Sequence, residues 1–371
     1  MKSFFLAATA IALNRLDFLQ SITDNGSVLL LISSSMKNQD SPPPTTMLRF
    51  APSLVQSSSV DLDCLGSKSR YFRRKIQETV ARDPSLAGPL IRLAFHDAAT
   101  FENGPRYYYV DRGSMNTSVQ TGGPNGSIRY ELGRYENRAL SRPLKVVEEI
   151  LDSVNDKNGP TGSRAFLCNP MSLADAIALA GSSAVDASGG PDIPIRLGRP
   201  DVDTSDDQLL RRPMKRNSKG SEVTTALPSA GLDSDGLRLY FGRLGLSEPE
   251  FVALSGVHGL GRHVSLLNMT KDCLKNLTQT CLENAPVLLP FVTESVDRFD
   301  NSYFKGLLRW NSQQVSMGEV AFIPTDVALV VDDGLRGYVE SFAHDEKLYF
   351  RTFRRAFQKL VDTTATTGDL Y

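Results

Sequence analysis

Two of the four histidines in this chain have neighbours that could take part in chemistry. His96 lies in the run LIRLAFHDAATF, with Arg92 four residues before it and Phe95 beside it. On a helix, residues four apart project from one face, one turn apart. A neutral imidazole placed there can accept and return a proton, and a guanidinium can stabilise charge that develops on an oxygen atom. The alternative is a buried, mutually satisfied pair with a purely structural role.

The second histidine, His258, lies in EFVALSGVHGLGR at the end of another predicted helix. Its neighbours Gly256 and Gly259 are small, so a flat and bulky group could approach the backbone there. A lone histidine at a helix end is more often structural, and this motif gains weight only beside the first one. His263 and His344 lack such settings, and we interpret both as surface or packing residues.

Composition excludes several classes of function. The chain has 41 basic and 42 acidic residues, a net charge of −1 that gives no electrostatic reason to expect a nucleic-acid partner. Its four cysteines show no CxxC spacing, which argues against a zinc site. The 41% hydrophobic content is ordinary for a soluble globular protein.

Residues 1–60 are typical of a targeting or disordered segment. Lys2 precedes an apolar run, Phe4 to Leu13, that is too short to span a bilayer, and we expect no stable membrane span. A second short run, Val28 to Ile32, is followed by SPPPTT, which can bury little apolar surface. A plastid transit sequence and a secretory signal each fit parts of this segment, so the compartment stays open at this point.

Apolar spacing beyond residue 61 predicts a mainly α-helical fold without internal repeats. Ser247, followed three residues later by Glu250, is a capping arrangement for the helix that leads to His258. Loops or insertions are expected over 102–122, 201–227 and 268–290, and a boundary is expected near residue 190, in GGPDIPIRLGRP. The predicted helices cover 69–81, 90–95, 141–154, 172–186, 237–245 and 248–258, with two more in 334–361.

A series of motifs then resembles the plant–fungal–bacterial haem peroxidase superfamily, in family order from about residue 62 to 361. These motifs are RLAFHDA, GGPNGSIRYEL, SLADAIALAG, GGPDIPIRLGR, EFVALSGVHGLGR, FDNSYFKGLL and IPTDVALVVDD. YELGRYEN and the lengthened loops are most similar to the ascorbate-peroxidase-related plant proteins. The resemblance implies an all-α fold of two lobes with haem b between them. The distal lobe would span about 61–190 and the proximal lobe about 191–361, followed by a tail over 362–371.

The resemblance also implies roles for individual residues on the distal side of the haem, where peroxide binds. His96 matches the acid–base histidine and Arg92 matches the distal arginine. Asn137 matches the asparagine that holds the other ring nitrogen of the distal histidine and so fixes its tautomer. Glu131 lies in the segment before it and is expected to assist.

On the proximal side, His258 matches the ligand of the haem iron. Asp326 matches the carboxylate that accepts the ring N–H of that ligand and lowers the iron's reduction potential. Phe291 is expected to lie against the haem site. Thr293, Ser295 and Asp300 match family positions for a bound K⁺ or Ca²⁺, although Gly259 stands where the family often has a threonine ligand.

Three positions depart from the ascorbate-using branch of the family. Phe95 stands where that branch has tryptophan beside the distal histidine, and Val292 stands where it has tryptophan against the proximal one. Leu267 replaces an arginine that grips ascorbate, and the one tryptophan, Trp310, lies outside the motif. We therefore expect hydrogen peroxide as a substrate and a small phenol or ascorbate as the electron donor. An oxidising equivalent is not expected on a tryptophan near the iron.

The resemblance further implies two disulfides, Cys64–Cys168 and Cys273–Cys281, by similarity to secreted plant peroxidases. It favours a chloroplast location, in the lumen or stroma, with a transit peptide and a part in the response to oxidative stress; secretion is the alternative. Two other functions stay open: a catalytically weak relative with a structural or regulatory role in a plastid complex, and a haem sensor. The presence of both the distal and the proximal residues argues against each of them.

Overall fold

The structure is a computed structural model that describes most of the chain beyond residue 57. The described residues are 19–24, 27–32, 57–108, 115–156, 170–202, 214–216, 222–224, 227–228, 231–264, 288–291, 296–310 and 322–363. Two compact units are distinguished, Met1–Val60 and Asp61–Tyr371. In the first unit, β1 (Leu19–Asp24) and β2 (Ser27–Ile32) pair in antiparallel orientation. The targeting role of residues 1–60 stays a prediction.

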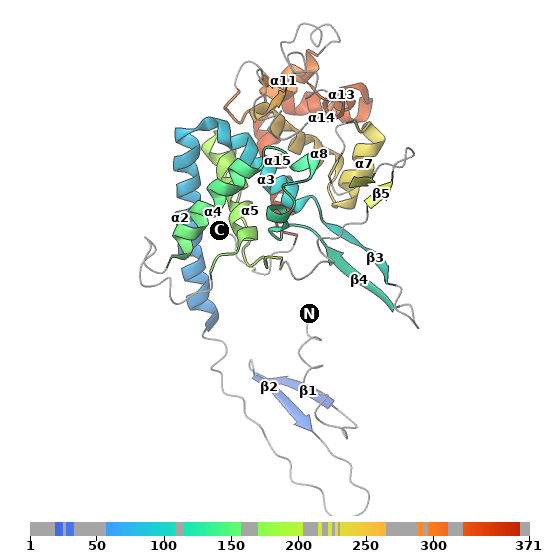
Figure 1. The fold of residues 1–371 in the computed structure, drawn as a ribbon. Coiled ribbons are helices and arrows are strands. Elements are labelled where there is room, and N and C mark those ends of the chain that lie inside the picture. Colours follow the sequence, from blue (N-terminus) through green and yellow to red (C-terminus); the bar gives the residue numbers. More distant parts are fainter. Residues whose placement is uncertain are drawn as a thin grey trace, which may run out of the picture. The chain divides into compact units, whose positions relative to one another are not determined.

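The described part of the larger unit is built mainly from helices (Figure 1), which confirms the expected all-α class. Short 3-10 helices accompany them: η2 (Pro84–Leu86), η3 (Ser127–Tyr130), η4 (Tyr135–Asn137) and η6 (Gly256–Leu260). The α-helices are α2 (Ser57–Arg82), α3 (Ala87–Ala98), α4 (Ser141–Asn155), α5 (Leu173–Ala187), α7 (Ser234–Arg243), α8 (Glu248–Ser255), α11 (Ser302–Leu308), α13 (Pro324–Val331), α14 (Asp333–His344) and α15 (Glu346–Val361).

The segment 102–122, expected to be a loop or an insertion, contains two strands that the sequence did not indicate. This segment forms an antiparallel hairpin of β3 (Glu102–Tyr108) and β4 (Met115–Thr121). β3 contains Asn, Gly and Pro, which are depleted in strands, and β4 alternates only weakly, with Met115 and Val119 as its apolar residues, so hydrophobic pattern alone did not reveal the pairing. Two shorter hairpins join β5 (Met214–Arg216) to β6 (Glu222–Thr224) and β7 (Arg262–Val264) to β8 (Leu288–Pro290).

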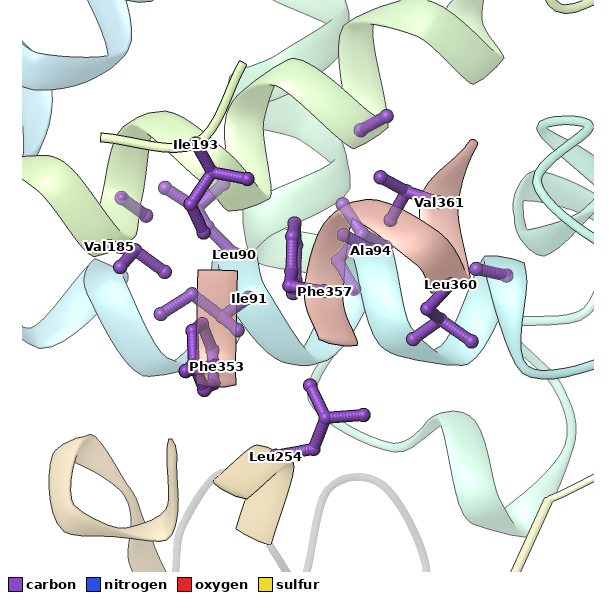
Figure 2. Packing of buried hydrophobic residues seen from close by; sticks show 14 of the residues in the cluster. Leu90, Ile91, Ala94, Val185, Ile193, Leu254, Phe353, Phe357, Leu360 and Val361 are labelled. Atoms are coloured by element: carbon purple, nitrogen blue, oxygen red, sulfur yellow. The ribbon is translucent and has the colours of Figure 1, made fainter. Parts of the chain in front are cut away.

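The core of the larger unit lies where α3, α5 and α15 meet. Gly181 of α5 allows the close approach, because a Cβ atom there would lie 2.6 Å from Ala94 Cβ and 2.8 Å from Phe357 Cζ. Figure 2 shows Leu90 and Ala94 of α3 beside Phe353 and Phe357 of α15. Burial of the leucine and phenylalanine side chains, at about 1.5–3 kcal/mol each, fixes α3 in place. From Leu90 to Ala98, the residues that are not fully buried are Arg92, Phe95 and His96.

A buried ion-pair network ties the segment after α5 to the end of α15. The Arg199 side chain is 0% exposed, and its guanidinium bonds to Asp175 and Asp362, each at 2.9 Å. Its Nε also donates to the carbonyl oxygen of Val361 at 2.8 Å. Guanidinium forks suit such paired acceptors. Arg199 follows the predicted lobe boundary near residue 190, and the division into two lobes stays a prediction.

Two further expectations concern cysteines and membranes. Cys64 is disulfide-bonded, while Cys168, Cys273 and Cys281 lie outside the described residues, so both predicted pairings stay predictions. Among the described residues, no helix is both long and apolar enough to cross a bilayer.

Candidate active site

The distal residues are carried by α3, whose other faces are buried in the core. Arg92 and His96 lie one turn apart on this helix, as predicted from their spacing. Phe95 contacts the edge of the His96 ring, with 6.0 Å between the ring centroids and an interplanar angle of 65°. On its other side Phe95 packs against Phe241 of α7, with centroids 6.3 Å apart. The phenyl ring therefore links the helix of the distal residues to α7.

Asn137 holds the His96 ring from η4. Its Oδ1 lies 2.8 Å from His96 Nδ1, and its Nδ2 donates to the carbonyl oxygen of Glu131 at 3.0 Å. The second bond assigns the amide orientation, so the oxygen faces the imidazole and Nδ1 must carry the hydrogen. His96 Nε2 then bears the lone pair. It has no hydrogen-bond partner among the residues that the structure describes.

Glu131 is itself held by residues that sequence reasoning did not identify. The carboxylate is 3% exposed, and it accepts hydrogen bonds from Ser127 Oγ at 2.9 Å and Arg134 Nη1 at 2.8 Å. With the side chain fixed in this way, its backbone carbonyl offers Asn137 a rigid acceptor. The feature of the sequence that could have indicated these contacts is the short spacing of Ser127, Glu131 and Arg134 within GSIRYELGRYEN.

Arg92 is tethered through two backbone carbonyls. Nη1 donates to the oxygen of Arg138 at 2.7 Å and Nη2 to that of Glu136 at 2.5 Å. Burial, followed by the neighbouring charge of Arg138, lowers the pKa of Arg92 to about 10, which leaves it charged at neutral pH. The carbonyls are presented by a tight turn in which Ala139 adopts a positive φ of 63°, a conformation that L-residues adopt at a cost of about 1–2 kcal/mol.

The electrostatics of the distal site keep His96 neutral. Burial and the adjacent Arg92 charge lower the pKa of His96 well below its usual value, while the Asn137 bond opposes them. A neutral imidazole with a free Nε2 lone pair is a proton acceptor, and a nearby guanidinium can stabilise negative charge. The distal residues are therefore arranged for proton transfer at Nε2.

On the proximal side, the helix that leads to His258 begins as predicted. Ser247 and Glu250 form the capping box of α8, with Ser247 N donating to Glu250 Oε2 at 2.8 Å. The chain continues from α8 into η6, which carries His258. His258 Nδ1 lies 2.8 Å from Asp326 Oδ1. Because a carboxylate only accepts, Nδ1 carries the hydrogen and Nε2 bears the lone pair.

Asp326 connects this histidine to the start of α13. The carboxylate is 1% exposed, and its Oδ2 accepts from the backbone N–H of Ile323 at 3.0 Å. Tyr303 of α11 also donates to Oδ1, at 2.6 Å. Sequence reasoning did not single out Tyr303, although it lies inside the FDNSYFKGLL motif.

Two aromatic rings flank the His258 imidazole. Phe291 stacks on it, with centroids 4.6 Å apart and an interplanar angle of 17°, and Tyr303 meets it nearly edge-on at 6.0 Å and 81°. The imidazole is still 32% exposed, and its Nε2 has no hydrogen-bond partner among the described residues. This histidine is oriented by its surroundings and keeps one ring nitrogen available as a ligand.

The elements that carry the two histidines touch directly. Gly88, two turns before His96 on α3, lies against Leu260, two residues after His258; a Cβ at Gly88 would lie 2.9 Å from the Leu260 carbonyl oxygen. The two imidazoles share one hydrogen-bonding pattern. In each, Nδ1 is bonded to a buried acceptor, and Nε2 has no partner among the described residues. This pair of side chains fits a haem, whose iron takes an imidazole nitrogen as ligand.

The predicted cation site is only partly described. Thr293 and Ser295 lie outside the described residues, as do Val292 and Leu267. Asp300 accepts from the backbone N–H of Ser302 at 2.8 Å. Within the described ranges no group of three or more His, Cys, Asp or Glu could hold a metal ion. A K⁺ or Ca²⁺ site stays a prediction.

Comparison with known proteins agrees with the arrangement of these residues. The chain is 32% identical over 291 residues to "L-ascorbate peroxidase 1, cytosolic" of Oryza sativa subsp. japonica, covering 78% of this chain and 89% of the relative. It is 33% identical over 296 residues to "Putative L-ascorbate peroxidase 6" of Arabidopsis thaliana, covering 79% and 68%. The peroxidase family matches residues 72–345. The chain therefore belongs to the peroxidase family, as a relative of the plant-type haem peroxidases.

Proposed function

We propose that this protein is a haem peroxidase that reduces hydrogen peroxide with one-electron donors. The proposal is carried by two histidines that make the same ring hydrogen bond but have different charged neighbours. His96 and His258 each have Nδ1 tied to a buried acceptor, and each has an Nε2 with no partner among the described residues. One histidine is kept neutral beside Arg92, and the other is backed by a carboxylate. A pair of purely structural histidines would have no need of this asymmetry.

His258 would hold the haem through Nε2, with Phe291 packed on the ring and Asp326 accepting from Nδ1. When bound, haem supplies an iron that binds peroxide and exchanges electrons with the reductant. Because the chain contains no CxxC spacing, covalent attachment of the c type is not expected, and haem b is the proposed cofactor.

The distal residues would move one proton and stabilise one charge. His96 Nε2 accepts the proton of one peroxide oxygen and delivers it to the other, which leaves as water. Arg92, charged at neutral pH, stabilises the negative charge that grows on the leaving oxygen. Asn137 keeps His96 in the tautomer that this transfer requires.

The donor and the compartment are proposed from relatives and from single residues. Relatives are named L-ascorbate peroxidases, whereas Phe95 differs from the ascorbate-using branch, so small phenols and ascorbate are both proposed donors. One relative in Arabidopsis thaliana, "L-ascorbate peroxidase T, chloroplastic", is 31% identical over 73% of this chain and supports a plastid location. A role in the response to oxidative stress would follow from the proposed consumption of hydrogen peroxide. The disulfide at Cys64 favours the lumen or secretion over the stroma.

Haem titration followed by turnover tests the proposal. The full chain is loaded with haem, the Soret band is recorded, and peroxide is added with guaiacol or with ascorbate. His96→Leu should keep the Soret band and lose about 10²–10⁴-fold in turnover, the usual contribution of a general acid–base group. His344→Leu, which changes an exposed histidine outside the site, should behave as the unaltered protein.

Three results would contradict the proposal. No haem uptake would favour a structural role in a plastid complex. Haem uptake without turnover in the unaltered chain would favour a haem sensor. Full turnover in His96→Leu would remove the assigned role of His96.

A further inference from the structure

One carboxylate oxygen on the proximal side accepts two hydrogen bonds from different helices. Asp326 Oδ1 lies 2.8 Å from His258 Nδ1 and 2.6 Å from the hydroxyl of Tyr303. The other oxygen, Oδ2, is engaged by the backbone N–H of Ile323 at 3.0 Å. The carboxylate is 1% exposed, so the strength of each bond depends on the protein donors around it more than on water.

Tyr303 is held rigidly in this position. It is 0% exposed and lies on α11, whose first residue follows Asn301; the Asn301 side chain donates to the carbonyls of Phe342 and Ala343 at 3.0 and 2.9 Å. Tyr303 Cβ is also in van der Waals contact with the position that a Cβ at Gly259 would take, at 3.4 Å. The hydroxyl is therefore aimed at Asp326 by packing against the element that carries His258.

We propose that Tyr303 is a positioning residue that weakens the His258–Asp326 hydrogen bond and thereby sets the electron donation of His258 to the haem iron. This inference rests on the proposed function, since its consequence is expressed at the iron. Two donors share the electron density of one oxygen, and the shorter Tyr303 bond withdraws part of what His258 Nδ1 would otherwise receive. A weaker bond gives less imidazolate character and a less negative ferric/ferrous potential.

Tyr303→Phe removes the hydroxyl and keeps the ring. Tyr349→Phe is a matched control: Tyr349 is likewise 0% exposed, and its hydroxyl has no hydrogen-bond partner among the described residues. In the haem-loaded protein, Tyr303→Phe should shift the ferrous iron–histidine stretching band to higher frequency and the ferric/ferrous potential to more negative values. Tyr349→Phe should leave both where the unaltered protein has them.

A second readout does not require haem. In the full chain without haem, the proton on His258 Nδ1 should move downfield in the NMR spectrum of Tyr303→Phe, because its bond to Asp326 strengthens. Site-specific 3-fluorotyrosine at 303, which has a more acidic hydroxyl, should move it upfield. This second substitution keeps the test valid if the phenylalanine variant folds poorly.

The outcomes separate the two proposals. Failure of the unaltered chain to bind haem would overturn the proposed function, while the NMR shifts would still decide whether Tyr303 weakens the bond. An unchanged Nδ1 proton in both Tyr303 variants would overturn the inference. So would a shifted Nδ1 proton with an iron–histidine band that stays in place.

Discussion

Replacement of Asn137 by leucine tests whether the orientation of His96, and not merely its presence, drives the reaction with peroxide. The change keeps the approximate volume of the side chain and removes both of its hydrogen-bonding groups. His96 Nδ1–H loses its acceptor at 2.8 Å, and the Glu131 carbonyl loses its donor at 3.0 Å. Asn137 is 1% exposed, so water does not readily replace either bond.

The expected loss of stability follows from the two groups that lose their partners, His96 Nδ1–H and the Glu131 carbonyl. Each buried group left without a partner costs about 1–3 kcal/mol, so the free energy of unfolding should fall by about 2–4 kcal/mol once part of the loss is relieved by local adjustment. The imidazole can then rotate and place its hydrogen on Nε2, which cannot accept a proton. Misplacement of a catalytic group by about 1 Å can cost 10²-fold, and we expect the rate with peroxide to fall by about that factor.

Stopped-flow measurement of the Soret change on mixing with peroxide gives the rate directly. Asn155→Leu is the matched control, because the Asn155 amide also makes two bonds, to the backbone carbonyl and N–H of Met171, both at 2.9 Å. It should lose stability but react at the unaltered rate. If Asn137→Leu also reacted at the unaltered rate while losing stability, the Asn137 amide would be structural and the tautomer argument would fail.

Two further predictions concern stability. Burial and Arg92 lower the pKa of His96 in the folded chain, so as the pH falls below about 6.5 the unfolded chain takes up this proton more readily, and stability is lost. In the haem-free protein, denaturant unfolding should show a smaller loss between pH 7 and 5 in His96→Leu than in the unaltered chain, by at most about 2 kcal/mol, the limit that the unfolded-state pKa sets. An equal loss in both would refute the linkage. Arg199→Met should lower the free energy of unfolding by about 3–5 kcal/mol, because it leaves the Asp175 carboxylate buried without its cation and takes one of two arginines from Asp362, which keeps Arg196. Arg336→Met, at a half-exposed pair, should cost about 0.5 kcal/mol or less, and similar losses in the two arginine variants would contradict the role of burial.

Helix positions in the distal part were accessible from the sequence because their apolar residues recur over three or more turns. The prediction over 141–154 corresponds to α4, and that over 172–186 to α5. The shorter helices α11 and α13 span 7 and 8 residues, too few for a periodic pattern to be distinguished from a loop. They are also the elements that carry Tyr303 and Asp326. The proximal site was therefore the harder one to assemble from local pattern.

The features of the site that the sequence did not predict depend on contacts between residues far apart in the chain. The one-turn spacing of Arg92 and His96 follows from helix geometry alone. His258 and Asp326 are separated by 68 residues, and their 2.8 Å contact depends on how η6, α11 and α13 pack, which residue spacing does not encode. Asn137 and Asp326 were identified by resemblance to a family, and Tyr303 was not. The shared carboxylate oxygen became visible only when the side chains were placed.

The contact of Gly88 with Leu260 sets how closely α3 and η6, the two elements that carry His96 and His258, can approach each other. A Cβ atom at Gly88 would lie 2.9 Å from the Leu260 carbonyl oxygen, so α3 and η6 leave no room for a side chain at that point. Since α3 is also packed against the core, a larger residue at position 88 would have to displace η6, the element that carries His258. The relative placement of the two histidine-bearing elements therefore depends on a glycine that takes no part in the proposed chemistry.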